Sequence, residues 1–537
     1  MKFDPNHNPY LTIRKPVYGT KGMVATSQPL AAQAGLEVLK KGGNAVDAAI
    51  ATAAALTVVE PTSNGIGADA FAIVWIGGKM HGLNSSGYAP KNISIDAVRS
   101  LGYSEMPTSG VVPITVPGAP AAWAELSAKF GKLPFKDCLA PAVAYAMDGY
   151  ALSPVLAENW NLAHLHFCKT PTASEYKAWF DTFAPKKTSP PKVGEIWSSS
   201  AHAETLLEIA ETKAESFYRG RLADAISAHI AKLGGFLSKS DLEEYTPQWV
   251  EPISANYRGY DVWEMPPNGQ GIVTLIALNI LKEFDVIGTS FENSCHIAFE
   301  AMKLAFTAGK EFITDPKCMT VSVDELLSKE YADKLRSKIT DTAMEPAPIS
   351  PKSGGTVYLC TADKDGNMVS FIQSNYMGFG SGIVIPGTGI SMQNRGADFR
   401  LDPTHANALA PRKQTYHTII PGFLTKDGVP VGPFGVMGGY MQPQGHLQVI
   451  MNTVDYNLNP QAALDRPRWQ WIDGKNFEVE SAFCEKVCEN LIKRGHKVTV
   501  SEMTGKFGRG QMIMRDSASG VLCGGTESRC DGHIAVW

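Results

Sequence analysis

The chain has 537 residues, of which 44% are hydrophobic and 19% charged, so it can bury a large core. Its formal net charge of −4, without a basic stretch interleaved with aromatic residues, argues against nucleic acid as a partner. No apolar run reaches the roughly 18 residues that a membrane-spanning helix needs, so we also expect no membrane partner.

The cysteines and the first residues indicate the compartment. The nine cysteines are odd in number and widely scattered, which favours reduced thiols over a disulfide framework. Residues 1–9 lack the apolar core of a signal peptide. We therefore predict a cytoplasmic protein. Because no cluster of His, Cys and carboxylate residues has metal-ligand spacing, we expect neither a metal nor a cofactor.

Two helices are predicted between residues 23 and 60. Ser27 can cap the first helix, which Gly42 and Gly43 end. Asn44 can cap the second, over 45–58, which is apolar nearly all round. Such a helix should be buried inside a large core.

The rest of the chain alternates between helical blocks and short strands. Residues 60–70 form a glycine-rich turn before a strand predicted at 71–75. The turn lacks the Lys and the following helix of a phosphate-binding loop, so we do not expect nucleotide binding there. The block pattern favours an α+β fold of packed layers. The predicted helical blocks cover 116–165, 200–235, 290–340 and about 445–465, and short strands follow residue 356 and run again to Trp537.

A β-hairpin is predicted directly after Gly354 and Gly355. Thr356 opens a β-branched run, Asp365-Gly366 supplies a strong turn signal, and a second apolar run returns. If the loop has three residues, 364–366, equal counting places Ser374 opposite Thr356. A two-residue loop would shift the pairing by one and weaken this contact.

The start of the hairpin resembles a place where a chain cuts itself. An N-terminal Thr carries a hydroxyl nucleophile and an amine base on one residue, and breaking the Gly355–Thr356 bond would create one. Pro346, Pro348 and Pro351 precede it and are typical of an exposed linker, where a cut is tolerated. The alternative is an ordinary surface hairpin that begins with Thr.

Several separated motifs occur in the order known from one family. They lie at 42–49, 58–61, 116–118, 130–134, 265–267, 363–370, 379–382, 438–439 and 467–468. With these motifs the chain resembles the γ-glutamyltranspeptidase family of N-terminal-nucleophile hydrolases over nearly its full length. The resemblance implies a four-layer αββα sandwich, formed as one composite domain by a large subunit, 1–355, and a small subunit, 356–537.

The resemblance also implies roles for individual residues. Thr356 is expected to be the nucleophile, Ser374 the hydroxyl that assists it, and Gly438 and Gly439 the source of oxyanion-hole amides. Glycines let backbone N–H groups approach an oxyanion closely, and one such donor is worth roughly 3–4 kcal/mol of barrier. The alternative for the glycine pair is a plain tight turn. The new α-amine, with an ordinary pKa of about 7.7–8, can act as the base.

The chain departs from the family pattern where the substrate is bound. Ser86 stands where the family has a substrate-carboxylate Arg, Tyr376 replaces an Asn, and Arg395 replaces a Gln. Only Asp398 remains where the family holds the substrate amine. Losing the Arg removes a bidentate clamp that Ser cannot replace.

These departures shape the predicted function. Residues 434–446 are similar to a divergent branch that includes oxamate amidohydrolase and transpeptidase-like proteins. We therefore expect a self-processing hydrolase of a small carboxylate-bearing amide, with Arg395 as the anion clamp; a surface salt bridge is the alternative role for Arg395. His417 and His446 are interpreted as structural.

Three other functions stay open. The first is γ-glutamyl transfer or glutathione hydrolysis, which Ser86 disfavours. The second is an acylase of larger amides, which an apolar pocket near Tyr376 and Phe379 would favour. The third is an inactive binding protein on the same fold. The expected partners are the small-molecule amide and the two fragments as a heterodimer, and a dimer of heterodimers is the further assembly considered.

Overall fold

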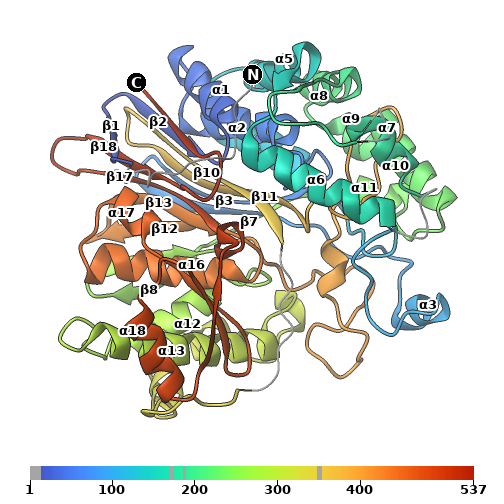
Figure 1. Ribbon diagram of the computed structural model, residues 1–537. Coiled ribbons are helices and arrows are strands. Elements are labelled where there is room, and N and C mark those ends of the chain that lie inside the picture. The colour runs from blue at the N-terminus through green and yellow to red at the C-terminus, as the bar shows by residue number, and fades with distance from the viewer. Residues whose placement is uncertain (1–13, 170–174, 185–188, 347–353) are drawn as a thin grey trace.

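Two seven-stranded sheets lie face to face, and a layer of helices covers the outer face of each (Figure 1). This computed structural model describes residues 14–169, 175–184, 189–346 and 354–537. The predicted αββα sandwich is therefore confirmed. Pro348 and Pro351 of the expected linker lie outside the described residues. Among the described helices, none combines the length and apolar character needed to cross a bilayer.

The first sheet carries the predicted hairpin at its centre. Its neighbouring strands all run antiparallel. In spatial order they are β19 (His533–Val536), β2 (Gly22–Thr26), β10 (Gly355–Asp363), β11 (Met368–Tyr376), β3 (Asp69–Ile76), β4 (Lys79–Ser85) and β7 (Gln248–Val250).

The second sheet also mixes strands from both halves of the chain. In spatial order they are β1 (Val17–Gly19), β18 (Leu522–Thr526), β17 (Arg509–Arg515), β13 (Val429–Met437), β12 (Gly422–Lys426), β9 (Tyr260–Glu264) and β8 (Ile253–Tyr257). Apolar side chains such as Phe71, Tyr358 and Phe423 fill the space between the two sheets. Because both sheets take strands from 1–355 and from 356–537, neither fragment holds a complete sheet.

The remaining strands of the described residues form two smaller sheets, one of three strands and one of two. The three-stranded one pairs β15 with β16 in parallel, and the other has two strands. Their strands are β14 (Trp469–Asp473), β15 (Asn476–Glu480), β16 (Lys497–Ser501), β5 (Tyr150–Ala151) and β6 (Ile196–Trp197).

The helical layer on the first sheet begins with α1 (Pro29–Lys40) and α2 (Ala45–Val59). Every residue of α2 is buried, and the Asn44 side chain accepts from two amides of its first turn, as predicted. The predicted cap of α1 is wrong by one residue. Gln28 caps that helix, because the Ser27 hydroxyl is hydrogen-bonded to Glu60 instead.

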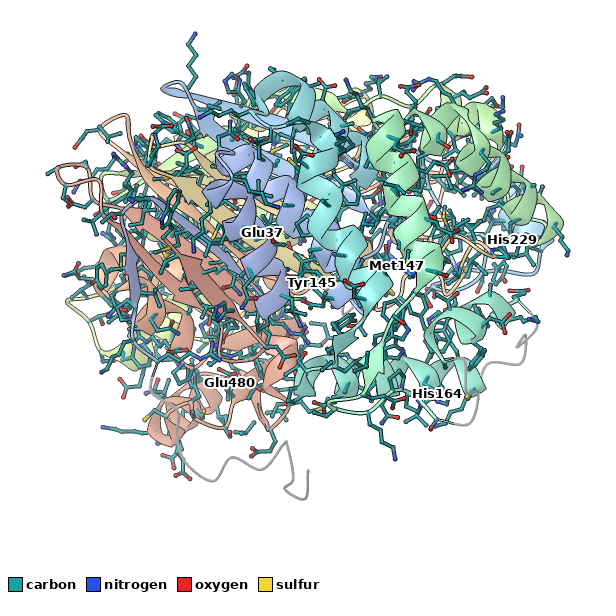
Figure 2. All side chains as sticks on the ribbon, turned by 90° about the horizontal axis from the view of Figure 1, so that it is seen from above. Glu37, Tyr145, Met147, His164, His229 and Glu480 are labelled. Atoms are coloured by element: carbon teal, nitrogen blue, oxygen red, sulfur yellow. The ribbon has the colours of Figure 1, made fainter. Side chains whose placement is uncertain are left out.

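Further helices extend this layer, and Figure 2 shows it from above. The Tyr145 hydroxyl reaches across to α1, the helix of Glu37, and donates to the Leu30 carbonyl at 3.1 Å. These helices are α4 (Ala119–Phe130), α5 (Phe135–Asp148), α6 (Pro154–Lys169), α7 (Lys177–Phe183), α8 (Ser200–Thr212), α9 (Glu215–Arg219), α10 (Arg221–Lys232) and α11 (Lys239–Glu243). The short helix α3 (Ile95–Ser100) lies apart from them and packs through Val98 with Phe399 and Leu401 (Figure 1).

The opposite layer covers the second sheet. Its helices are α12 (Gly271–Leu281), α13 (Phe291–Phe312), α14 (Val323–Leu326), α15 (Lys329–Arg336), α16 (Met441–Ile450), α17 (Pro460–Asp465) and α18 (Glu485–Lys493). The single helix predicted at about 445–465 is wrong in its bounds. It starts at Met441, passes into a π-helical turn and stops before Asn457, whose positive φ of 51° ends the helix. Asn459 and Pro460 then start α17.

Candidate active site

Thr356 lies at the start of β10, in the centre of the first sheet. The loop of the hairpin is 364–366, because Ala362 pairs with Met368 and the Asp363 amide donates to the Asn367 carbonyl. The loop therefore has three residues, which is the case in which counting places Ser374 opposite Thr356. At the other end a register shift between Gly355 and Val357 bends the strand at Thr356.

Two hydroxyls and one carbonyl meet at this bend. The Oγ1 of Thr356 lies 2.9 Å from the Oγ of Ser374, and both side chains are fully buried. Ser374 Oγ donates to the Gly355 carbonyl at 2.8 Å and accepts the Tyr376 amide at 2.8 Å. Because Ser374 has one proton and gives it to this carbonyl, the Thr356 hydroxyl is the donor in the bond between the two side chains.

The predicted glycine pair lies against the residue before the bend. Gly438 and Gly439 connect β13 to α16 with φ values of 138° and 61°, which side chains rarely adopt. A Cβ added to Gly354 would lie 3.3 Å from the Cα of Gly439. The backbone of this turn is therefore next to Gly354 and Gly355, at the positive end of α16.

A cleft of about 500 Å³ opens beside these glycines. Gly354, Gly355 and Gly438 form part of its wall, whereas Thr356 lies buried beneath Gly355. The apolar lining residues are Leu162, Ala163, Phe167, Met377, Phe379 and Met437. The polar lining residues are Thr62, Ser63, Thr108, Ser109, Asn159, His166, Lys506 and Arg509. The cleft is therefore roomy, mixed in character and bounded by the chain that precedes Thr356.

The three predicted substrate-binding residues lie together, and none of them is among the residues that line this cleft. Tyr376 is nevertheless its neighbour, because a Cβ on Gly354 in the cleft wall would lie 3.4 Å from the Tyr376 ring. The Tyr376 hydroxyl donates to Asp398 Oδ1 at 2.9 Å, and the Tyr440 hydroxyl donates to the same oxygen at 2.8 Å. Burial raises the pKa of both tyrosines well above its ordinary value, so they remain neutral donors. Asp398 lines a second, polar cavity of about 370 Å³ together with Tyr440 and Arg400.

Arg395 is fully buried under Tyr376. Its guanidinium lies 4.3 Å from the centre of the Tyr376 ring and donates from Nη1 to Thr418 at 2.7 Å. Its Nε lies 3.5 Å from Oδ2 of Asp69, which also contacts His417 at 3.1 Å. Burial raises the pKa of Asp69 to about 7, although Arg395 opposes this shift. Arg395 is not among the residues that line either cavity, and its role as an anion clamp stays a prediction.

The remaining candidates occupy structural positions. Ser86 is buried, and its hydroxyl donates to Asn84 at 2.8 Å. His446 Nδ1 lies 2.6 Å from Glu264 in the core. The cleft residues Leu162, Phe167 and Arg509 were missed by the sequence analysis. They lie far from Thr356 along the chain. The only local pattern that could have indicated one of them is the pair of glycines, Gly508 and Gly510, on either side of Arg509.

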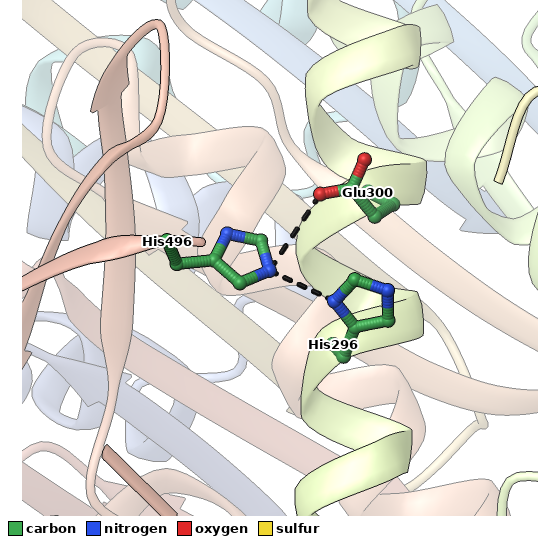
Figure 3. Close-up of side chains that lie close together, drawn as sticks. All are labelled: His296, Glu300 and His496. Atoms are coloured by element: carbon green, nitrogen blue, oxygen red, sulfur yellow. Dashed lines mark hydrogen bonds and ion pairs between the residues drawn. The ribbon is translucent and has the colours of Figure 1, made fainter. Parts of the chain in front are cut away.

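A buried cluster of two histidines and a glutamate joins the two predicted fragments (Figure 3). His296 and Glu300 lie on α13, and His496 precedes β16; their ligand atoms all lie within 4.8 Å of one another. His296 Nδ1 is hydrogen-bonded to His496 Nε2 at 2.8 Å, and the other ring nitrogen of His296, Nε2, lies 2.7 Å from the Thr340 carbonyl. Lys303 pairs with Glu300 at 2.5 Å. A divalent ion would have to separate the imidazoles and would add charge beside Lys303, so we assign the cluster a structural role.

The αββα sandwich with a hydroxyl at the start of a central strand defines an N-terminal-nucleophile hydrolase. The family model described as gamma-glutamyltranspeptidase matches residues 31–537, and the chain belongs to that family. It is an amide-bond hydrolase, as its relatives are.

Individual relatives match nearly the whole chain. The glutathione hydrolase-like YwrD proenzyme of Bacillus subtilis (strain 168) is 37% identical over 97% of this chain and 99% of its own. The oxamate amidohydrolase proenzyme of Klebsiella pneumoniae is 33% identical over 96% and 98%. The crystal structure of cephalosporin acylase from Bacillus halodurans superposes with a TM-score of 0.97 and 59% identity, covering 100% of this chain and 99% of that one. The word proenzyme in two of these names agrees with a chain that is processed into two subunits.

Proposed function

We propose that the chain cuts itself between Gly355 and Thr356 and then hydrolyses an acyl amide through an ester on Thr356. The observation that carries this proposal is the contact of Thr356 and Ser374 beneath the Gly355 carbonyl, with both oxygens within 2.9 Å of Ser374 Oγ. A hydroxyl pair that only stabilised a hairpin would not need to polarise the preceding carbonyl.

In the cutting step the Thr356 Oγ1 attacks the Gly355 carbonyl carbon. Its proton passes to Ser374, and Ser374 passes its own proton to the former amide nitrogen as the C–N bond breaks. The product is an ester between Gly355 and the Thr356 oxygen, which water hydrolyses to a carboxylate and a free hydroxyl. A Cβ on Gly355 would lie 3.0 Å from the Gly378 amide nitrogen, so glycine keeps this carbonyl uncrowded.

In turnover the new α-amine takes the proton from Thr356 Oγ1. Such an amine has an ordinary pKa of about 7.7–8 and is partly neutral near pH 7. The amides of Gly438 and Gly439 stabilise the oxyanion. The α-ammonium then gives its proton to the nitrogen of the leaving amine, and the C–N bond breaks to leave the acyl-enzyme. Water then releases the acid. Departure of Gly354 and Gly355 from their wall of the cleft would open Thr356 to the substrate.

The shape of the cleft favours hydrolysis of larger acyl amides over hydrolysis of oxamate or of a γ-glutamyl amide. A cleft volume of about 500 Å³ and the apolar lining residues suit an extended acyl group better than oxamate. The name of the Bacillus halodurans relative points the same way. A γ-glutamyl group would need Asp398, whose Oδ1 is held by two tyrosines and which lines the other cavity.

Oxamate-like hydrolysis remains the second candidate. The observation that favours it is the Nη2 of Arg395, a buried donor without a hydrogen-bond partner among the described residues. A panel of p-nitroanilides and amides tests both functions: four- to eight-carbon acyl groups, oxamate, glutathione and γ-glutamyl-p-nitroanilide. The proposal expects the highest kcat/KM for the extended acyl amides and none for Thr356→Ala. Faster turnover of oxamate or γ-glutamyl-p-nitroanilide would overturn the ranking.

A further inference from the structure

Gln270 is a fully buried glutamine directly before α12, in the large fragment. It follows the motif at 265–267, which takes no part in the proposed mechanism. Its Nε2 donates to the carbonyl of Gly439 at 2.9 Å and to that of Thr418 at 2.6 Å. Its Oε1 accepts the Tyr416 hydroxyl at 3.0 Å. The side chain therefore ties the large fragment to two segments of the small one.

The partners of Gln270 settle which atom of its amide donates. Two carbonyls can only accept, so the nitrogen must face them. Burial raises the pKa of the Tyr416 hydroxyl well above its ordinary value, so this group stays protonated and donates to the remaining oxygen. Both N–H groups and the oxygen of Gln270 are thus occupied, and its side chain is held from three sides.

The carbonyls of the glycine pair are fixed by donors. Gly438 O accepts the Met441 amide at 3.0 Å, and Gly439 O accepts the Gln442 amide at 3.2 Å in addition to Gln270. In a trans peptide the N–H points away from the preceding carbonyl, so the bond to Met441 directs the Gly439 amide away from α16. Neither glycine amide makes a backbone hydrogen bond within the described part of the chain. Both are therefore available to an oxyanion.

A turn of two glycines needs support from outside to keep one conformation. Glycine allows more backbone conformations than any other residue, and Gly439 has a φ of 61°. Among the described residues, Gln270 is the only donor to the two carbonyls that does not belong to α16. With the peptide planes on both sides of Gly439 fixed, its φ and ψ are fixed as well.

We infer that Gln270 is a positioning residue that holds the glycine pair in the conformation that receives the oxyanion of the substrate. This inference rests on the proposed role of Gly438 and Gly439 in turnover. Because Gln270 acts across the fragment boundary, the fragment that carries Thr356 depends on the other one for its oxyanion site. Self-cleavage does not need this support, since the Gly355 carbonyl is already bonded to Ser374 Oγ at 2.8 Å.

Hexanoyl-p-nitroanilide and pentylboronic acid test the inference on the fully cleaved enzyme. The boron accepts the Thr356 oxygen and becomes tetrahedral, with a hydroxyl at the place of the oxyanion, so the boronate probes this site without turnover. We expect Gln270→Leu to lower kcat by roughly 10- to 100-fold, less than the loss of a whole donor, and to leave KM within about twofold. The inhibition constant of the boronate should rise by the same factor as kcat falls. Self-cleavage should stay within a factor of about three of the wild-type rate, because it proceeds beside Ser374.

Gln448→Leu is the matched control. The Gln448 side chain is also buried and bonds to the backbone of Gln444 and Trp469, and none of these bonds reaches the glycine pair. This variant should leave kcat unchanged. An equal loss of kcat in Gln448→Leu, or an equal slowing of self-cleavage and turnover in Gln270→Leu, would overturn the inference. If Gln270→Leu does not fold, Gln270→Glu replaces it, because Glu keeps the oxygen that accepts Tyr416 and lacks the two donors.

Hydrogen exchange separates this inference from the proposed function. If the wild type cleaves no acyl anilide, the proposed function fails, but the exchange rate of the amides in 437–442 still measures how firmly the turn is held. Faster exchange there in Gln270→Leu than in both the wild type and Gln448→Leu supports the positioning role. Unchanged exchange refutes it.

Discussion

In the proposed mechanism one hydroxyl, that of Ser374, serves both reactions of Thr356. It lies between the nucleophile and the Gly355 carbonyl, at 2.9 Å and 2.8 Å. On that mechanism it relays a proton before the cut, and afterwards it continues to orient Thr356.

Removing either hydroxyl should therefore affect cutting and turnover together. The Thr356→Ala variant should neither cut itself nor turn over substrate, because it lacks the attacking oxygen. Ser374→Ala should slow both by roughly 10²-fold, the lower range for a lost proton-transfer group. Intact mass over time and anilide kinetics measure the two rates. Ser370→Ala, on the same strand and bonded to Tyr358, is the matched control; an equal effect there would mean that only strand stability had changed.

Gly355, the residue before the cut, should not tolerate a larger side chain. Gly355→Val should slow self-cleavage strongly, because its Cβ would crowd Gly378 N at 3.0 Å and Ser63 Cα at 3.3 Å. The fold should persist, since Gly355 lies at the strand end. A time course of fragment appearance measures this, with circular dichroism as the folding check. Unchanged cleavage kinetics would show that the Gly355 carbonyl is not confined as described.

Among the elements, α13 and the strand β16 are tied by the His296–Glu300–His496 cluster. Burial and the neighbouring charges of Lys303, His296, Arg494 and Lys475 lower the pKa of His496 to about 3. The folded protein therefore holds His496 neutral, while the unfolded chain protonates it near its ordinary value of about 6.5.

This linkage gives a pH dependence with a definite sign. Between about pH 6.5 and 3 the unfolded state binds more protons at His496, so the cluster's contribution to stability is present above pH 6.5 and is lost as pH falls. The slope is at most about 1.4 kcal/mol per pH unit. Glu60 and Asp69, with pKa values raised to about 7, act in the opposite direction, so only a difference isolates the effect.

Urea unfolding at pH 5 and pH 7 measures that difference. The gap in unfolding free energy between wild type and His496→Gln should be smaller at pH 5 than at pH 7. Thr307→Val, also on α13, removes a hydroxyl that donates to the Lys303 carbonyl but no titratable group, so it is the control and should show a nearly constant gap. A gap for His496→Gln that grows toward pH 5 would contradict the neutral buried state.

The helices and strands also show which features of the structure could be predicted from the sequence. The hairpin register was predictable on the condition of a three-residue loop, because such a loop fixes the pairs from Ala362 back to Val357 by counting, whereas the shift beyond Val357 was not predicted. Asn44 was predictable because capping is local. The start of α1 and the end of the helix before Asn457 were not predictable, since Ser27 is engaged by Glu60 from another segment and the helix changes to π geometry at Met451. Arg395 and Arg509 differ in burial and cleft access through packing of distant segments, which one sequence does not encode locally.

At the scale of the molecule, the two fragments share both sheets. Strands β10 and β11 of the small fragment are flanked by β2 and β3 of the large one. Cutting one peptide bond at Gly355 breaks none of these ladders.

The fragments should accordingly remain associated and unfold together. Size-exclusion chromatography with light scattering should give a mass near 57.9 kDa or a multiple of it after complete cleavage. Separate elution of 1–355 and 356–537 without denaturant would refute the shared core. The same measurement tests the dimer of heterodimers, and fractionation of the native host tests the cytoplasmic location; both remain predictions.

The most direct test of the central claim is intact mass of purified protein, followed together with anilide activity at neutral pH. We expect the 537-residue chain to be converted into fragments 1–355 and 356–537, and the activity to rise in proportion to the fraction of chain that is cut. With substrate present, the 356–537 fragment should transiently gain the mass of the acyl group. Full activity in a chain that remains uncut, or an acyl group on the 1–355 fragment, would contradict Thr356 as the N-terminal nucleophile.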